Sequence, residues 1–390
     1  MTITYRVDKD ILYIAVEGRI DASNASQAEE TIVNIKNNNQ GKHTVLDADG
    51  LEYISSAGLR VILRLRKEEP KLAIINVAPD VYEVLDMTGF TEMVTIEKAY
   101  KRMSVEGCEF IAKGANGAVY RYDNETIVKT YFAKDALPEI KQERENARRA
   151  FVLGINTAIP YGIVRVGDSY GTVTELLNAT SVTKLIRSNP EDLTVPAKYY
   201  IDMLKSIHEI EAEEGELPDM KQTALAWAKF VSDYIPKDQA DKLVALIEAV
   251  PKQNTLMHGD YHTNNVMVQN GEPLLIDMDT LCMGHPIFEL GSMFNAFVGY
   301  SELDHQNMMD FFGYSFETAG RFWRLALKMY LGTEDEEVLN KVEEKAMVVG
   351  YTRMLRRAIR RPDEKESPAK IARCKEMLAT LLGKVDTLTF

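Results

Sequence analysis

The 390-residue sequence predicts an α/β domain in its first hundred residues and a larger α+β domain after it. Strand-like and helix-like segments alternate through the first hundred residues, which is the pattern of an α/β unit. Residues 108–132 read as strands joined by small-residue turns, whereas the chain beyond Asp279 has mostly helical spacing, as in residues 311–331 and 338–359. The second domain should therefore combine a sheet with a helical region.

In the first domain, alternating apolar residues predict strands and longer polar-faced segments predict helices. The expected strands cover residues 12–18, 44–47 and 72–76, and the expected helices cover residues 22–38, 57–66 and 81–87. Ser55 and Ser56 directly precede the apolar helical run that starts at Ala57, which is where N-capping hydroxyls occur. These serines therefore read as helix caps, and a cap position does not exclude phosphorylation.

The second domain opens with two strands around a glycine-containing turn, Phe110–Tyr120. Gly114, Asn116 and Gly117 lie in this turn, where small residues let backbone amides approach phosphate oxygens. The strand Thr126–Tyr131 then carries one lysine, Lys129, among β-branched residues. A lysine in a single strand is often a solvated edge residue; together with the loop described below, Lys129 is a candidate to pair with phosphates.

The next segment, Ala136–Leu153, is rich in Glu, Lys, Arg and Ala and predicts a helix. Glu143 shares a face with apolar positions of this helix and should face the sheet, with Glu145 as the alternative. Both glutamates could also be solvated helix charges. The strand Ser169–Leu177 follows and leaves the sheet region.

The run His258-Gly259-Asp260-Tyr261-His262-Thr263-Asn264-Asn265 has the spacing of a phosphoryl-transfer site. An aspartate followed five positions later by an asparagine can set a carboxylate beside an incoming hydroxyl while the amide oxygen binds a cation. Two short strands joined by the turn Gln269–Glu272 should return Asp277 to Asn265, because Asn-Gly favours a tight hairpin. Oxygen donors suit Mg²⁺, so Asn265 and Asp277 are the predicted metal ligands. His258 and His262 could alternatively be structural histidines.

These motifs resemble the catalytic core of the aminoglycoside phosphotransferase and choline kinase group, distant relatives of protein kinases. The group's motif reads His-Gly-Asp, four residues, Asn, then Ile-Asp, although His285 and Glu289 stand where the group often has two further aspartates. The resemblance implies a bilobal protein-kinase-like fold, with a small lobe at about 105–177 and a helical large lobe at about 178–390. It further implies an ATP site. By resemblance Asp260 is the catalytic base, Asn265 and Asp277 hold Mg²⁺, Gly114, Asn116, Gly117 and Lys129 contact ATP, Glu143 orients Lys129, and Glu175 to Leu177 form the adenine hinge.

The first domain is similar to the STAS domain of anti-sigma factor antagonists. Three segments carry the resemblance, Gly18–Ala22, Ile54–Leu59 and Leu85–Phe90, all in the family's order. In that family a serine of the middle segment is phosphorylated by a partner serine kinase. By resemblance Ser56 is the phosphoacceptor, with Ser55 in place of the usual preceding aspartate, and an anti-sigma factor or serine kinase is the implied partner.

Composition and charge narrow the class of protein. No apolar run approaches the roughly 20 residues of a membrane span, and the N-terminus runs into a strand without an apolar signal core, so a cytoplasmic protein is expected. The three cysteines lack paired spacing and read as core thiols. With 46 basic and 59 acidic residues the net charge is −13, which argues against nucleic-acid binding and favours cationic substrates or partners.

The boundary between the domains is expected within Ile96–Glu106, which gives domains at 1–98 and 105–390. Trp227 and the acidic cluster after His208 could line a substrate site, but a core helix and a solvated charge run fit them better. The arginine stripe from Arg353 to Arg361 could bind an anion, but a solvated helix face fits it better. The sequence thus predicts an ATP- and Mg²⁺-dependent phosphotransferase acting on a small-molecule hydroxyl; the alternatives are a protein serine kinase acting on STAS-type partners and a nucleotide-binding regulator without turnover.

Overall fold

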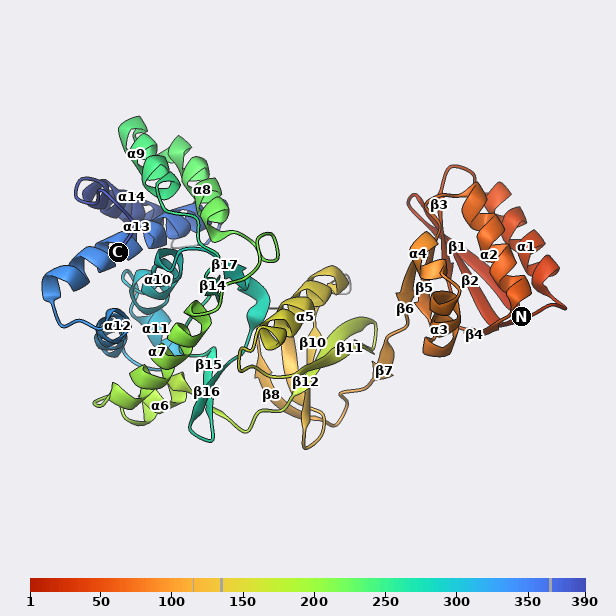
Figure 1. The fold of residues 1–390 in the computed structure, drawn as a ribbon, viewed down its shortest axis with the longest axis horizontal. Helices are drawn as coiled ribbons and strands as arrows, with labels where there is room; N and C mark the ends of the chain where they lie inside the picture. The colour runs from red at the N-terminus through yellow and green to blue at the C-terminus, as the bar shows by residue number, and fades with distance from the viewer. Residues whose placement is uncertain (115, 134–135, 365–366) are drawn as a thin grey trace. The chain divides into compact units, whose positions relative to one another are not determined.

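The computed structural model describes residues 1–114, 116–133, 136–364 and 367–390. The chain divides into two compact units, drawn as a ribbon in Figure 1. The first unit contains Met1–Ser104 and Val164–Gly167, and the second contains Val105–Ile163 and Asp168–Phe390. None of the helices in the described residues is long and apolar enough to cross a membrane.

The first unit is a six-stranded sheet with helices packed on it. Its strands are β1 (Thr2–Asp8), β2 (Ile11–Ile20), β3 (His43–Asp47), β4 (Leu51–Ile54), β5 (Ala73–Val77) and β6 (Thr95–Lys98). Its helices are α1 (Ala25–Asn37), α2 (Ser56–Glu68), α3 (Pro79–Met87) and α4 (Phe90–Met93). The sheet order is β1-β2-β3-β5-β6, with β4 paired to β2, and every pair except the hairpin β1-β2 is parallel. Alternating buried residues of β2, such as Leu12, Ile14 and Val16, form the core with α1 and α2, which lie side by side (Figure 1).

Helix α2 begins one residue earlier than the sequence predicts. Ser55 is the N-cap, with an extended backbone and a side chain that accepts from the amide of Gly58 at 3.5 Å. Ser56 is the first helical residue and is exposed, so the interpretation of Ser56 as a cap is wrong. An exposed hydroxyl at the first turn lies where the helix dipole favours an added negative charge.

Five strands and one helix form the small lobe of the second unit, although the last residues of β11, Val164–Val166, belong to the first unit. The strands are β8 (Glu109–Lys113), β9 (Gly117–Arg121), β10 (Thr126–Tyr131), β11 (Pro160–Val166) and β12 (Ser169–Glu175), and the helix is α5 (Leu137–Val152). The sheet order is β11-β12-β10-β9-β8, and β10 is antiparallel to both of its neighbours. Strand β10 is the middle one of these five strands, and its Val128 is fully buried.

The rest of the second unit is a helical lobe around one large apolar core. Its helices are α6 (Val182–Ser188), α7 (Thr194–His208), α8 (Met220–Val231), α9 (Lys237–Glu248), α10 (Ile287–Phe294), α11 (Gln306–Phe312), α12 (Phe316–Leu331), α13 (Glu336–Arg360) and α14 (Ser367–Leu382). Short strands and turns complete it: β13 (Thr180–Ser181), β14 (Leu256–Met257), β15 (Val266–Gln269), β16 (Glu272–Leu275), β17 (Cys282–Met283), the 3₁₀ turns η1 (Ser232–Tyr234) and η2 (Met278–Thr280), and the π-helical turn η3 (Asn295–Gly299). Tyr200, Tyr261, Phe297 and Phe322 form an aromatic cluster in this core, with ring centroids 4.6 to 5.7 Å apart.

Two expectations about elements need correction, and one strand was not expected. The predicted linker Ile96–Glu106 contains the end of β6 and a further strand, β7 (Lys101–Met103), which pairs in parallel with Val164–Val166 of β11. The predicted helix 311–331 is two helices, because Gly313 adopts a left-handed φ of 73° and ends α11. Strand β4 was not predicted, since Leu51–Ile54 is short and its burial alternates irregularly.

Two lesser predictions concern core residues. Trp227 is 8% exposed and belongs to the core, which confirms the interpretation of its helix as a core helix. Cys282 and Cys374 are buried thiols, whereas Cys108 is only half-buried.

Candidate active site

The hairpin of β15 and β16 brings the two predicted metal ligands together. Asn270 and Gly271 have φ angles of 53° and 84°, as a two-residue hairpin turn requires. The amide of Ile276 donates to the carbonyl of Asn265 at 3.0 Å, and this bond sets Asp277 beside Asn265. Asp277 itself has a φ of 65°, a conformation that is uncommon outside glycine and that gathers at functional sites.

A buried carboxylate supports the backbone before Asp260. Glu289 of α10 is 1% exposed and accepts from the amides of His258 at 2.6 Å and Gly259 at 3.1 Å. Burial raises the pKa of Glu289, although nearby His258 and the two amide hydrogen bonds oppose that rise. From the other side, the hydroxyl of Thr280 donates to the carbonyl of His258 at 2.7 Å. The loop is therefore held by two elements that are distant in sequence.

A third clamp on the loop comes from α13. Arg353 donates to the carbonyl of Gly259 at 3.1 Å and to the hydroxyl of Ser292 at 2.8 Å, and Ser292 also donates to Gly259. The guanidinium carbon lies 5.7 Å from the ring centroid of Trp227. The expectation of a solvated helix face is wrong for Arg353, because its side chain is only 25% exposed and is bonded to the loop.

Asp260 presents its carboxylate to a cavity. The side chain is 48% exposed, with Nε2 of His262 at 3.6 Å from one carboxylate oxygen and the Arg353 guanidinium at 4.0 Å from the other. Burial lowers the pKa of His262, despite the opposing charge of Asp260, so the imidazole is neutral near pH 7. A partly exposed carboxylate with fixed neighbours can accept a proton from a hydroxyl that enters the cavity.

Asn265 and Asp277 supply oxygen donors for a cation, and Asp279 lies close to them. The amide nitrogen of Asn265 donates to the carbonyl of Asp260 at 3.1 Å, which leaves the amide oxygen to act as a ligand. Partial burial, the charge of Asp277 and the charge of Glu143 raise the pKa of Asp279 to about 7. Repulsion among carboxylates is what a divalent cation would relieve, so these residues fit Mg²⁺.

This site would not enclose a cation by protein alone. In the described ranges, no group of three or more His, Cys, Asp or Glu side chains is arranged to hold a metal ion. Mg²⁺ in phosphoryl-transfer sites typically takes one or two protein ligands together with phosphate oxygens and waters. The oxygen donors of Asn265 and Asp277 suit that mode, with Asp279 as a further neighbour that the sequence analysis did not assign.

Lys129 and Glu143 form the ion pair that the sequence predicted as one possibility. Nζ of Lys129 lies 2.5 Å from one carboxylate oxygen of Glu143, and the hydroxyl of Tyr131 donates to the other at 2.5 Å. Burial acts to lower the pKa of Lys129, but the charges of Glu143, Asp279 and Asp277 outweigh it, and the pKa is raised. Lys129 is therefore a charged, oriented ammonium group.

The alternative glutamate, Glu145, lies elsewhere. It pairs with Arg148 at 2.7 Å and with Arg149 at 3.2 Å on the same helix. Hydrogen bonds from these arginines, that of Arg148 foremost, lower the pKa of Glu145 to about 2. Glu143, rather than Glu145, is the helix residue that faces Lys129.

The turn between β8 and β9 carries Gly114, Asn116 and Gly117, while Ala115 lies outside the described residues. The amide of Gly114 donates to the carbonyl of Gly117 at 2.9 Å, and the carbonyl of Asn116 accepts from Phe132 at 3.0 Å. A Cβ atom at Gly117 would lie 2.0 Å from the carbonyl oxygen of Thr130, so only glycine fits there. The turn is thereby fixed against β10, the strand of Lys129.

The predicted hinge follows β12. The amide of Glu175 donates to the carbonyl of Ile159 at 3.0 Å. In return, the side-chain carboxylate of Glu175 accepts from the amide of Ile159 at 3.2 Å. Leu176 donates to the carbonyl of Glu125 at 2.7 Å, and Leu177 is half-buried in the connection that leads to β13. The glutamate side chain thus fastens β12 to the start of β11.

Helix α5 is joined to η2 by an asparagine that the sequence analysis did not single out. Asn146 is 3% exposed and donates to the carbonyls of Met278 at 3.2 Å and Asp279 at 3.3 Å. Gln142 orients it by donating to its amide oxygen at 2.9 Å. The only sequence signal was spacing, because Asn146 lies three residues after Glu143 on the same helix.

Comparisons with known proteins identify the family of each domain. The sequence profile of the phosphotransferase enzyme family matches residues 107–324, more than half of the 390 residues, so the chain belongs to that family. The STAS domain profile matches residues 2–121. The two matches overlap over 107–121, which the structure places in the second unit. The protein is a STAS domain followed by a phosphotransferase domain.

Individual relatives cover one domain or the other. A protein named as a candidate anti-sigma factor antagonist, BtrV of Bordetella bronchiseptica, is 31% identical over 100 residues, which is 25% of this chain and 85% of that protein. The ADP-bound structure of aminoglycoside phosphotransferase APH(2'')-Ib is 17% identical and covers 77% of this chain and 98% of its own, with a TM-score of 0.46. A choline/ethanolamine kinase family protein from Mesorhizobium loti is 12% identical and covers 71% of this chain and 91% of its own, with a TM-score of 0.45.

Proposed function

We propose that the domain at 105–390 transfers the γ-phosphate of ATP to a hydroxyl of a small molecule in a Mg²⁺-dependent reaction, and that the domain at 1–98 is a STAS regulatory module. One observation carries the proposal: Asp260, Asn265 and Asp277 lie on one loop and hairpin, while Lys129 is held by Glu143 and influenced by Asp277 and Asp279. A base, oxygen donors for a cation and an oriented ammonium group are the parts that phosphoryl transfer needs.

Each residue has a definite task in this mechanism. Lys129, aimed by Glu143, contacts the α- and β-phosphates, and the amides of the turn at Gly114 and Gly117 approach the phosphate oxygens. Asn265 and Asp277 would hold Mg²⁺, which supplies neutralisation of phosphate charge. These contacts place the γ-phosphate in front of Asp260.

The chemical step transfers the γ-phosphoryl group of ATP to the acceptor hydroxyl. Asp260 takes the proton of the acceptor hydroxyl as that oxygen forms a bond to the γ-phosphorus. The bond between the γ-phosphorus and the β,γ-bridging oxygen breaks, and its electrons leave with ADP. Arg353, His262 and Glu289 act as positioning residues, because they fix the loop that carries Asp260.

A second candidate function is a protein serine kinase that acts on STAS-type partners. The observation that favours it is the exposure of Ser56 at the first turn of α2, where a kinase could reach the hydroxyl. A regulator without turnover is disfavoured, because Asp260, Asn265, Asp277 and Lys129 are all present and the ion pair of Lys129 is formed.

The decisive experiment compares the wild-type protein with Asp260→Asn. The variant should bind MgATP like the wild type, whereas turnover should fall by roughly 10² to 10⁴-fold, the range of general-base contributions. Coupled ADP release, with aminoglycosides, amino alcohols, sugars, sugar acids and the purified protein itself as acceptors, measures the rate. Asp233→Asn, at an exposed aspartate after α8, is the matched control and should leave the rate unchanged. Equal turnover in Asp260→Asn and wild type would refute the assignment.

A further inference from the structure

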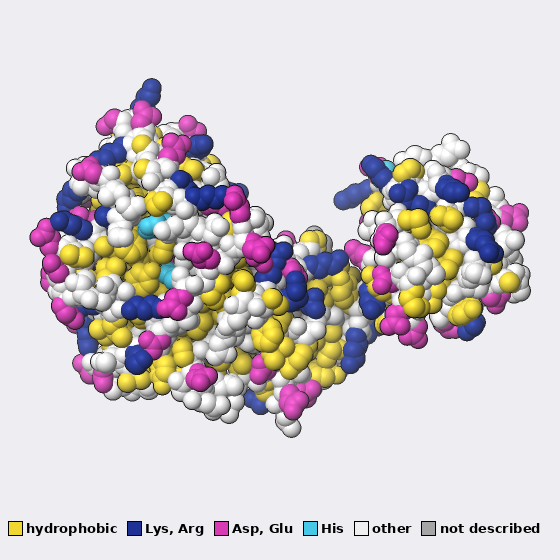
Figure 2. Space-filling model, viewed as in Figure 1, with side chains coloured by type: hydrophobic (Ala, Val, Ile, Leu, Met, Phe, Trp, Pro, Cys, Tyr) yellow, Lys and Arg dark blue, Asp and Glu magenta, His cyan; other side chains and the backbone are white. Residues whose placement is uncertain are grey.

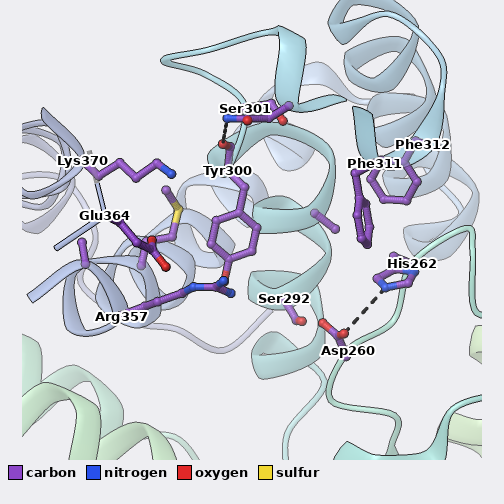
Figure 3. A pocket seen from close by; sticks show the side chains of 14 residues that line it. Asp260, His262, Ser292, Tyr300, Ser301, Phe311, Phe312, Arg357, Glu364 and Lys370 are labelled. Carbon is purple, nitrogen blue, oxygen red and sulfur yellow. Dashed lines mark hydrogen bonds and ion pairs between the residues drawn. The ribbon is translucent and has the colours of Figure 1, made fainter. Parts of the chain in front are cut away.

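The cavity in front of Asp260 has a volume of about 530 Å³, enough for a small molecule. Aromatic side chains line it from different elements: Phe311 and Phe312 of α11, and Tyr300, which follows the π-helical turn η3 (Figure 3). Phe311 is 58% exposed, so its ring is open to a molecule in the cavity.

The charged side chains that line the cavity do not favour a cationic ligand. Among the described residues that line it, the carboxylates are Asp260 and Glu364 and the cations are Arg357 and Lys370. Asp260 is the proposed base and already faces Arg353, and Glu364 pairs with Arg361 at 3.1 Å. Both carboxylates therefore have cationic neighbours within the protein.

Helix α13 extends a positive face from the catalytic loop into the cavity. Arg353 and Arg357 are four residues apart, so they lie on the same side of the helix one turn from each other. Arg353 is occupied by the loop, whereas the guanidinium of Arg357 lies over the ring of Tyr300, 5.3 Å from its centroid. Figure 3 shows Arg357 and Asp260 directed toward the same hollow from different elements.

The overall charge of the chain does not describe this cavity. The net charge is −13, but acidic and basic side chains are interspersed on the face of the second unit drawn in Figure 2. A bound acceptor responds to the charges within about a Debye length, roughly 8 to 10 Å, rather than to the total. The cationic substrates favoured by the net charge would meet the guanidinium of Arg357 as a like charge.

Building on the proposed phosphotransferase activity, we propose that the acceptor is a small hydroxyl compound that carries an anionic group, a carboxylate or a phosphate, bound by Arg357. The hydroxyl lies at Asp260, and the carbon skeleton packs on Phe311 and Tyr300. Guanidinium groups suit this task because their planar donors match the oxygens of carboxylates and phosphates.

Acceptors that differ mainly in charge test the inference with the full-length protein. Gluconate, glucose and glucosamine form one set, and glycerol 3-phosphate and glycerol form another; ADP release and product mass are measured with MgATP. The anionic member of each set should have the highest kcat/KM, about 10-fold above that of the neutral member. This factor corresponds to the lower end of the range for a hydrogen bond to a charged group, because the site is partly exposed. Arg357→Glu should reverse the order within the gluconate set.

The control is Arg360→Glu, which makes the same change of charge on the same helix at an exposed position that does not line the cavity. It should preserve the order of the acceptors. ATP consumption with glucosamine ahead of gluconate would overturn the inference while leaving the phosphotransferase intact, and absence of both MgATP binding and ADP release would instead overturn the proposed function.

Where MgATP binds but no probe is consumed, ligand-observed saturation-transfer NMR on the same compounds decides the inference. Gluconate bound in preference to glucosamine, with that preference reversed by Arg357→Glu, would support it. Equal binding of the two, or a preference for glucosamine, would overturn it.

Discussion

Gly259, directly before the proposed base, should not tolerate a side chain. Its φ is +80°, and a Cβ atom would lie 2.4 Å from the carbonyl oxygen of Thr280, well inside van der Waals contact. The left-handed conformation costs an alanine about 1 to 2 kcal/mol, and overpacking against backbone adds about 1 to 3 kcal/mol. Gly259→Ala should therefore lower the free energy of unfolding by about 2 to 5 kcal/mol.

Relief of this contact must move the loop away from η2. The hydrogen bond from the Thr280 hydroxyl to the His258 carbonyl would lengthen, and Asp260 would leave its place. A misplacement of about 1 Å can cost about 10²-fold in rate, so turnover should fall together with stability.

Gly271→Ala separates the two causes. Gly271 has nearly the same φ, +84°, but nothing lies within 4 Å of its Cβ position, so this variant should show only the conformational cost of about 1 to 2 kcal/mol. Urea unfolding followed by tryptophan fluorescence reports on the second unit, because both tryptophans, Trp227 and Trp323, belong to it. Equal losses in the two variants, together with wild-type turnover in Gly259→Ala, would refute the reasoning.

Two further predictions concern the proposed MgATP ligands, Asp277 and Lys129, and the STAS domain. Asp277→Ala should abolish Mg²⁺-dependent binding of nucleotide and Lys129→Ala should weaken alignment of ATP, so both variants should be nearly inactive. Calorimetric titration of MgATP into the Asp277→Ala variant checks the first effect. Wild-type affinity with wild-type Mg²⁺ dependence in this variant would mean that the metal ligand lies elsewhere. Ser56 should accept phosphate from a partner serine kinase without loss of the fold, and the added charge of about −1.5 to −2 should weaken partner binding. Peptide mass mapping locates the phosphate, with Asp260→Asn as the test for self-modification, and phosphate found only at other residues would contradict the prediction.

The sequence predicted those features that depend on local order. The hairpin turn at Asn270 and Gly271 is encoded by two adjacent residues, and the helix position of Glu143 follows from spacing within one element. The pairing of Lys129 with Glu143 could be predicted only as one of several possibilities, since each residue alone also fits a solvated position. Contact between a strand and a helix depends on packing that spacing does not show.

The contacts that support the loop carrying Asp260 could not be predicted in the same way. Glu289 and Arg353 lie about 30 and 94 residues from Gly259 and contact its backbone rather than a recognisable partner side chain. A glutamate in an apolar helix and an arginine in a charged helix read as ordinary residues until the helices are packed. The expectation of a solvated helix face failed at Arg353 for this reason, because solvation of a helix face depends on what lies opposite it.

The two halves of the proposed nucleotide site are linked through one helix. Glu143 of α5 orients Lys129 of the small lobe, and Asn146 of the same helix is bonded to the backbone of Met278 and Asp279 in η2. Leaving the almost fully buried side-chain amide of Asn146 without hydrogen-bond partners costs about 1 to 3 kcal/mol. Displacement of α5 is therefore unfavourable and breaks both sets of contacts at once. Docking of α5 therefore positions both Lys129, the proposed phosphate ligand, and η2, which follows the proposed Mg²⁺ ligand Asp277, so displacement of this helix should disturb both.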